Sequence, residues 1–346
     1  MEPSTAPSRI LITASELDEL STSNPDALVL IDTRDPDAYA AGHIAGAVNM
    51  HDIFTYLATS TQTTGNAAMR SRFAQLFGKA GLGGAETAVV YEEDMGAGPG
   101  GLGQSCRGWA ILRYMGYPED KTRVLDGGIA AWTALGGAVV ASERLSTPRS
   151  PVSANPRVFP ASDEGEDLLV GVDEMRSVVE RGGRGARGER VVILDTRDAE
   201  EWHCVSSSPY GADLCPRKGR IPGAVWIEWR EMMEKTTTEH GDVTGARIKG
   251  PEGVLRACAE VGIDRDTPVI VYCFKGARAS NALVALRGAG VRDVRMYMGS
   301  WNEWSRDEDL PIVSGTRQVS VSSGTRDKSL AIVTETTEIT VSDLSD

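Results

Sequence analysis

Four blocks of this sequence occur twice in the same order, and this repeat constrains the fold more than any other feature of the chain. The paired blocks are Ile10–Leu17 with Leu168–Met175, Val29–Asp35 with Val192–Asp198, Gly42–Val48 with Gly219–Val225, and Asp126–Trp132 with Met298–Trp304. In each half, short apolar and β-branched runs alternate with segments that carry apolar residues at helical spacing. Such alternation is typical of a mainly parallel sheet covered by helices. We therefore predict an α/β protein made of two tandem domains of similar fold.

The repeats and the composition between them predict the limits of the domains. The chain has 346 residues, a length that suits two domains of ordinary size. We predict an amino-terminal tail over residues 1–8, a first domain over 9–141, a linker over 142–167, a second domain over 168–314 and a polar tail over 315–346. The second copy also contains an insertion near residues 204–218, which is rich in Ser, Pro and Gly and predicts a surface loop.

Charge and composition exclude several classes of partner. The net charge of −13 disfavours binding to nucleic acid or to an anionic membrane. The first residues lack the basic start and apolar run of a secretion signal, and no long uncharged apolar segment predicts a membrane span. Five cysteines without regular spacing favour a reducing compartment over a disulfide framework, so we expect a cytoplasmic protein. No CxxC or HxxxH spacing is present, and we expect neither a metal nor another cofactor.

Cys273 lies where a predicted strand turns into a predicted helix. Val269–Tyr272 is a short apolar and aromatic run, suited to a strand that is buried on both faces of a parallel sheet. The pattern breaks at the cysteine, Gly276 opens a turn, and an Ala- and Leu-rich helix is expected to begin near Arg278. The unpaired N–H groups of a helix start stabilise a thiolate, and Lys275 and Arg278 add two positive charges. We therefore predict a nucleophilic thiolate, surrounded by the inward-pointing amides of the loop.

The first copy lacks a nucleophile at the same place. Alignment of the two strands puts Glu92 where the second copy has Cys273. The loop that follows is ten residues longer and rich in glycine, and Cys106 lies at its far end, beside Arg107 at the predicted helix start. We therefore predict that the first domain is catalytically inactive and that Cys106 is a packing residue.

A carboxylate and an arginine end the second repeated block in both copies. Asp195 and Arg197 follow one predicted strand, and Asp32 and Arg34 follow its equivalent in the copy without a nucleophile. Because the pair persists where no chemistry is expected, we predict a structural ion pair in each domain.

The chain resembles the tandem-domain rhodaneses, that is, thiosulfate or 3-mercaptopyruvate sulfurtransferases. The resemblance rests on the second copies of three repeated blocks together with the loop Cys273–Arg278, and it extends from about Arg9 to Ile312. It implies two tandem rhodanese-like domains, of which the second is catalytic. It also implies that Cys273 takes up a sulfur atom as a persulfide and passes it to an acceptor. The residues assigned to substrate binding are Lys275, Arg278, Arg217, Phe274, Gly276 and Ala277.

The resemblance also suggests the substrates. An arginine before the Gly-His-Ile-Pro-Gly block contacts the donor in this family, and Arg217 falls there, although Arg220 replaces the usual histidine. Basic residues in the loop are typical of thiosulfate-specific members, so Lys275 and Arg278 favour thiosulfate over 3-mercaptopyruvate. We expect a small anionic sulfur donor and, as acceptor, cyanide, a thiol or a protein.

Two other classes of function use a related site. Cysteine phosphatases and arsenate reductases have five residues between the Cys and the Arg of their loop. In this chain only four residues lie between Cys273 and Arg278. The narrower loop disfavours binding of a tetrahedral oxyanion. The second alternative is a non-enzymatic sulfur-relay or binding module. Both alternatives remain open from the sequence.

Overall fold

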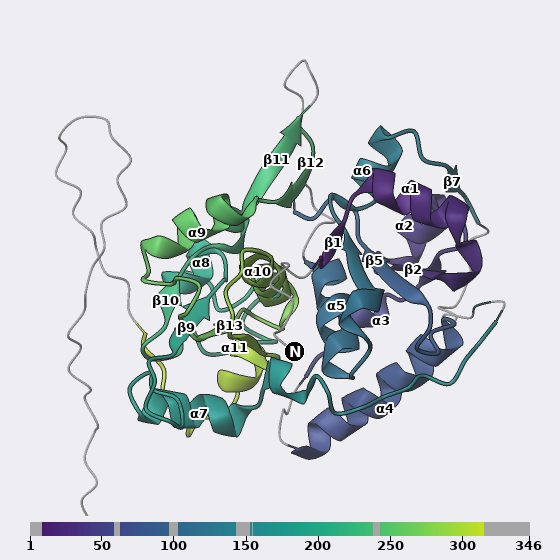
Figure 1. Ribbon diagram of the computed structural model, residues 1–346. Coiled ribbons are helices and arrows are strands. Elements are labelled where there is room, and N and C mark those ends of the chain that lie inside the picture. Colours follow the sequence, from purple (N-terminus) through teal and green to yellow (C-terminus); the bar gives the residue numbers. More distant parts are fainter. Residues whose placement is uncertain are drawn as a thin grey trace, which may run out of the picture.

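The chain forms two domains of the same topology (Figure 1). This computed structural model describes residues 9–58, 63–96, 103–142, 153, 155–237 and 243–314. Each domain contains a five-stranded parallel sheet, in the order β1-β6-β5-β2-β4 in the first and β8-β14-β13-β9-β10 in the second. Strands that correspond in the sequence repeat take the same place in both sheets, so the predicted duplication and fold class are confirmed.

The elements of the first domain alternate along the chain as the pattern predicts. Its strands are β1 Leu11–Ile12, β2 Leu28–Asp32, β3 His43–Ile44, β4 Val48–Asn49, β5 Thr87–Tyr91, β6 Thr122–Leu125 and β7 Val139–Val140. Its helices are α1 Ala14–Ser23, α2 Pro36–Ala41, α3 Asp52–Thr55, α4 Thr63–Lys79, α5 Gln104–Tyr114 and α6 Gly128–Ala134, with 3-10 turns η1 Pro25–Ala27 and η2 Glu119–Lys121. The short strands β3 and β7 pair antiparallel outside the main sheet.

The second domain repeats this order and adds an antiparallel hairpin. Its strands are β8 Leu169–Val170, β9 Val192–Asp195, β10 Val225–Trp226, β11 Met233–Thr237, β12 Val243–Ile248, β13 Val269–Tyr272 and β14 Val294–Tyr297. Its helices are α7 Val172–Glu180, α8 Ala199–Trp202, α9 Pro251–Ala259, α10 Ala277–Gly288 and α11 Ser300–Trp304, with 3-10 turns η3 Glu166–Leu168 and η4 Trp229–Met232. All four residues of β13 are buried, as expected for a central parallel strand with helices on both faces.

From the sequence, Ser15 and Asp173 are each expected to be the N-cap of the first helix in their domain, but both predictions are wrong, because the structure has the caps at Thr13 and Gly171, two residues earlier. Helix α1 begins at Ala14, because Thr13 caps it and forms a capping box with Glu16. Helix α7 begins at Val172 after Gly171. In α1 the cap is Thr13 because its side chain and that of Glu16, three residues later, bind each other's backbone N–H groups. The presence of a suitable cap residue alone does not show where a helix begins.

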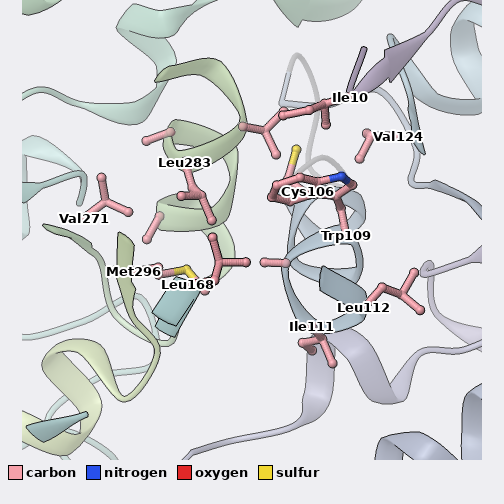
Figure 2. Packing of buried hydrophobic residues seen from close by; sticks show 14 of the residues in the cluster. Ile10, Cys106, Trp109, Ile111, Leu112, Val124, Leu168, Val271, Leu283 and Met296 are labelled. Atoms are coloured by element: carbon pink, nitrogen blue, oxygen red, sulfur yellow. The ribbon is translucent and has the colours of Figure 1, made fainter. Parts of the chain in front are cut away.

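The two domains share one hydrophobic core along helices α5 and α10. Figure 2 shows residues of α5, among them Cys106 and Trp109, in one cluster of buried side chains with Leu168, Leu283 and Met296 of the second domain. At their amino ends the helices come close enough to require glycine. A Cβ on Gly103 would lie 2.5 Å from the carbonyl oxygen of Ala277, at a φ of +76°. The start of one helix therefore presses against the start of the other.

Two further segments bind the domains together. The hairpin β11–β12 of the second domain reaches the first, where the Ala246 N–H donates to the Asp94 carbonyl at 3.0 Å (Figure 1). The segment between the domains lies along the first, where Phe159 packs against Phe77 and Tyr117. The domains are thus held by packing as well as by the chain that connects them.

Residues 204–218, predicted as a surface loop, contain neither helix nor strand. The predicted tails over 1–8 and 315–346 lie outside the described residues. Of the helices that are described, none combines the length and the apolar character needed to cross a membrane.

Candidate active site

Cys273 directly follows β13 and lies at the start of α10. Its side chain is 1% exposed. The loop turns at Gly276, where φ is +92° and a Cβ would lie 2.9 Å from Sδ of Met298, so the position requires glycine. The Gly276 N–H donates to Cys273 Sγ at 3.1 Å. Within the described chain this is the amide that binds the sulfur, and the helix dipole adds partial positive charge.

The last repeated block clamps this loop from the side. The Ser300 hydroxyl accepts the Cys273 N–H at 3.3 Å, and the Cys273 carbonyl accepts the Trp301 N–H at 3.0 Å. The Phe274 carbonyl accepts the Asn302 N–H at 2.9 Å. Ser300 adopts a left-handed φ of +53°, a conformation that non-glycine residues rarely take. The block therefore holds the backbone on either side of the sulfur in place.

The first domain uses the same clamp around a carboxylate. Ile129 and Ala130 donate their N–H groups to the carbonyls of Glu92 and Glu93 at 2.9 and 3.0 Å. The Glu92 side chain is buried and accepts hydrogen bonds from the Gly103 N–H at 3.1 Å and the Ser105 hydroxyl at 2.8 Å. The same strand-to-helix turn thus binds an anionic group at the place of Cys273.

Lys275 lies between two aromatic rings from distant parts of the chain. Its Nζ is 3.7 Å from the ring centroid of Phe54 and 4.9 Å from that of Tyr210. Burial lowers the pKa of Lys275 to about 8, and the positive charge of Arg107 contributes to this shift. The Lys275 ammonium group is therefore a cation that titrates close to physiological pH.

Arg278 turns toward carboxylates of the segment that begins α8. Its two terminal nitrogens donate to both oxygens of Glu201, and Nη1 lies 3.0 Å from Oδ2 of Asp198. Burial alone would lower the pKa of Arg278, but the Glu201 carboxylate outweighs burial and raises it. Arg278 therefore stays charged beside the loop, and the two carboxylates partly neutralise that charge.

The other predicted loop residues line the site in different ways. Phe274 is buried and its ring contacts that of Tyr210, with centroids 5.1 Å apart. Ala277 is buried at the contact with Gly103. Both shape the walls of the loop, and their part in substrate binding stays a prediction.

Arg217 and Arg220 bind carbonyl oxygens. The Arg217 guanidinium donates to the carbonyls of Asp307 and Leu310 at 2.6 and 2.9 Å, and the predicted donor contact would require it to release them. Arg220 stacks on Trp202 and donates to its carbonyl at 3.1 Å. The contact of Arg217 with the donor stays a prediction.

The predicted structural ion pairs are confirmed in both domains. Arg197 and Asp195 are fully buried and joined at 2.7 Å, and the Tyr272 hydroxyl donates to the same carboxylate. Arg34 and Asp32 form the equivalent pair, also at 2.7 Å. In each pair the aspartate ends a strand and the arginine lies two residues later, so the pair fixes the turn after β9 and after β2.

The remaining cysteines have structural surroundings. Burial raises the pKa of Cys106 well above its ordinary value and that of Cys258 to about 12, so both stay protonated at neutral pH and pack in the core. Cys215 is buried beside the Ser305 hydroxyl, and Cys204 is half-buried. Among the described residues, no group of three His, Cys, Asp or Glu side chains is placed to hold a metal ion.

Three residues around the loop were missed from the sequence: Phe54, Arg107 and Tyr210. Phe54 and Arg107 come from the first domain, and Tyr210 from the insertion. The partner of Arg278 was also missed, although comparison of the copies would have found it. Glu201 follows Asp195 by six residues, whereas Ala38 follows Asp32 by six. A carboxylate present in one copy alone is a signal for a role specific to that copy.

Comparisons with known proteins agree with the fold. The rhodanese-like domain matches residues 13–135 and again 184–307. A 3-mercaptopyruvate sulfurtransferase of Escherichia coli is 27% identical over 277 residues, which cover 79% of this chain and 84% of the relative. A thiosulfate sulfurtransferase of Azotobacter vinelandii is 26% identical over 292 residues, covering 82% and 90%.

A solved structure supports the architecture of both domains together. The anaerobic ergothioneine biosynthesis enzyme from Chlorobium limicola, in complex with trimethyl histidine, superposes with a TM-score of 0.67. It is 22% identical, and the match covers 89% of this chain and 71% of that one. The relatives named as sulfurtransferases are transferases of the rhodanese type, and the domain match spans most of the sequence. This chain therefore belongs to the rhodanese-like domain family and carries two copies of the domain.

Proposed function

We propose that this protein moves a sulfane sulfur atom from thiosulfate to a thiophilic acceptor through a persulfide on Cys273. The observation that carries this proposal is the position of the thiol. It ends a buried strand, faces the start of α10, and accepts the Gly276 N–H. Family membership supports sulfur transfer, and the geometry supports Cys273 as the residue that performs it.

The reaction consists of two displacements. In the first, the Cys273 thiolate attacks the outer sulfur of thiosulfate, a new S–S bond forms to Cys273, and the donor S–S bond breaks so that its electron pair leaves with sulfite. In the second, cyanide or a thiolate attacks the outer sulfur of the persulfide, and the Cys273 thiolate is the leaving group. Charge and electrons balance in both steps, because the electron pair of the broken S–S bond leaves with sulfite in the first step and with the Cys273 sulfur in the second.

The turn itself supports an anion in this place. In the first domain the equivalent turn binds the Glu92 carboxylate through Gly103 and Ser105. In the second domain, Gly276 and the start of α10 offer the same kind of donor to sulfur. The near-complete burial of Cys273 keeps water from the persulfide.

Thiosulfate is the proposed donor because the site is rich in cations. Lys275 and Arg278 lie on the loop, and Lys275 has no carboxylate partner among the described residues. A doubly charged donor gains more from such a site than a singly charged one. Turnover of thiosulfate and 3-mercaptopyruvate at equal concentration tests this choice, with the higher kcat/KM expected for thiosulfate.

Mass spectrometry of the intact protein tests the function directly. After incubation with thiosulfate and removal of the excess, we expect an adduct of one sulfur atom that peptide mapping places on Cys273. Cyanide should discharge the adduct and release thiocyanate. A sulfur adduct that only another protein can remove would indicate a relay module, and the absence of any adduct would exclude sulfur transfer from thiosulfate.

The same protein samples test the phosphatase alternative. The loop holds four residues between Cys273 and Arg278, and the Arg278 guanidinium is bound to Glu201. We therefore expect no hydrolysis of an aryl phosphate. Hydrolysis that disappears in Cys273→Ser would contradict this expectation.

Because of Lys275, we expect the kcat/KM of sulfur transfer to decrease as the pH rises. The ammonium is protonated below its pKa of about 8 and neutral above it, so its attraction for the donor is present at low pH and is lost as pH rises. We expect kcat/KM for thiosulfate to fall through about pH 8, measured between about pH 6.5 and 9.5. Lys275→Arg should move this fall to higher pH, and Lys275→Gln should remove it while lowering kcat/KM at neutral pH by roughly tenfold. An unchanged profile in Lys275→Gln would exclude this role.

A further inference from the structure

Arg107 belongs to the first domain but is buried beside the Cys273 loop of the second. Its side chain is 0% exposed. Its Nε lies 3.7 Å from the place that a Cβ on Gly276 would occupy, and Gly276 is the residue whose N–H binds Cys273 Sγ. Met298, which packs on the same glycine, has its Sδ 4.0 Å from Nη2 of Arg107. The guanidinium therefore contacts the wall of the sulfur site.

The hydrogen bonds of Arg107 leave its charge and one of its donors unused. Nη1 donates to the carbonyls of Ile53 and Phe54 at 2.8 and 3.1 Å, and Nη2 donates to the carbonyl of Tyr56 at 2.8 Å. In the part of the chain that the structure describes, Nε has no hydrogen-bond partner and no carboxylate pairs with this guanidinium. A buried cation without a counter-ion is energetically costly, so another group is expected to supply the negative charge.

Comparison with the second domain shows a difference between the two buried arginines beside the loop. Both helices begin after a glycine with a left-handed φ, Gly103 and Gly276, and Arg107 is the fourth residue of α5 whereas Arg278 is the second residue of α10. Arg278 is neutralised by Glu201, but the equivalent of Glu201 in the first copy is Ala38. The first domain thus has no acid at the place of Glu201, and among the described residues Arg107 pairs with no carboxylate.

Arg107 and Cys273 are close enough to interact electrostatically. Burial lowers the pKa of Arg107 to about 10, and interaction with Cys273 opposes this shift more than any other charge does. Arg107 therefore stays protonated at neutral pH. The other ionisable groups that face Cys273 are Lys275 and Arg278 of its own loop and helix and Tyr210 of the insertion. Of these cations, Arg278 is shared with Glu201 and Lys275 titrates near pH 8.

We propose that Arg107 is the counter-cation of Cys273, supplied by the domain that has no nucleophile. It acts as a positioning residue that stabilises the negative charge on the sulfur both before and after sulfur uptake. This inference deepens the proposed function and rests on it for the persulfide, but the effect on the free thiol is independent of any donor. The first domain thereby takes part in the reaction without a nucleophile of its own.

The rate of alkylation of Cys273 as a function of pH tests the proposal without a sulfur donor. Iodoacetamide reacts with the thiolate, and peptide mass spectrometry resolves Cys273 from the other cysteines. In Arg107→Met we expect the midpoint of the profile to move up by at least about one pH unit, which slows alkylation at neutral pH roughly tenfold. Arg107→Lys keeps the charge and should show a smaller displacement. A smaller displacement in Arg107→Lys than in Arg107→Met would show that the lost charge, rather than the lost hydrogen bonds, moves the alkylation profile.

A matched control comes from the same helix. Arg113 lies in α5 and binds the Tyr117 carbonyl, close to Glu119. Arg113→Met should leave the alkylation profile of Cys273 unchanged. A folded Arg107→Met protein with the profile of the wild type would overturn the proposal, whether or not thiosulfate is a donor.

Nuclear magnetic resonance of the unaltered protein provides a second test if Arg107→Met fails to fold. The side-chain Nε–H resonance of Arg107 should shift when thiosulfate loads Cys273 and return when cyanide discharges it. Cys273→Ser should show no shift. If mass spectrometry finds the sulfur adduct but the resonance stays in place, the counter-cation role is wrong while the proposed function stands. If no adduct forms, the alkylation profile alone decides.

Discussion

Replacing Cys273 with serine should lower the rate of sulfur transfer from thiosulfate to cyanide by at least about 1,000-fold, because removal of a covalent nucleophile eliminates the reaction path it provides. A serine hydroxyl is not ionised at neutral pH and cannot form a stable persulfide. The Ser300 hydroxyl binds the backbone N–H of residue 273, which the substitution does not change. The Gly276 N–H can donate to a serine hydroxyl as it does to the cysteine sulfur, so the loop should keep its shape. Steady-state formation of thiocyanate measures the loss.

Cys204→Ser provides the matched control. Cys204 lies in the insertion, is half-buried, and makes weak contacts with the Trp202 carbonyl and Arg220. We expect this variant to retain the wild-type rate and to form the sulfur adduct on Cys273. Transfer that persists in Cys273→Ser, or disappears in Cys204→Ser, would show that the nucleophile has been assigned to the wrong residue.

Replacing Asp195 with asparagine should destabilise the protein by about 3 to 5 kcal/mol, the usual range when one partner of a buried ion pair is removed. Both Asp195 and Arg197 are fully buried, so Arg197 would keep its charge in an apolar environment. Its other contacts include the Gly219 carbonyl and the rings of Tyr272 and Trp301, and none of these carries a negative charge. Urea unfolding followed by tryptophan fluorescence measures the change in the free energy of unfolding.

The first domain offers the control for this change. Arg34 forms the equivalent pair with Asp32 but also contacts Glu93 at 2.8 Å. Asp32→Asn leaves this second carboxylate in place and should destabilise the protein less than Asp195→Asn. Equal losses at the two sites would mean that the additional carboxylate contributes nothing and that desolvation of the arginine dominates.

Local sequence predicted the elements that are continuous along the chain. The repeat predicted two sheets of one topology, because each block is a strand, a turn or a helix start with its own pattern. The stretch from Val269 to Arg278 predicted a buried strand, a cysteine at its end and a helix that begins near Arg278, and the helix begins at Ala277. The persistence of Asp32 and Arg34 in the first copy predicted that Asp195 and Arg197 are structural. These features depend on neighbours within a few residues.

The surroundings of Cys273 depend on residues that are distant in sequence. Phe54 and Arg107 reach it from the first domain and Tyr210 from an insertion without regular structure. Arg278 was predicted to face the donor, but its binding to Glu201 appears only when α8 is placed beside α10.

The amino-acid sequence by itself determined the duplicated α/β fold, the position of the thiol between strand and helix, and the ion pair at the end of β9. Each of these features follows from short-range pattern and backbone geometry. Only the tertiary structure decided which cations keep their charge for Cys273. That outcome depends on the packing of α5 against α10 and on the acids that each arginine meets there. Charge interactions act through space and follow burial and distance, neither of which the order of residues reveals.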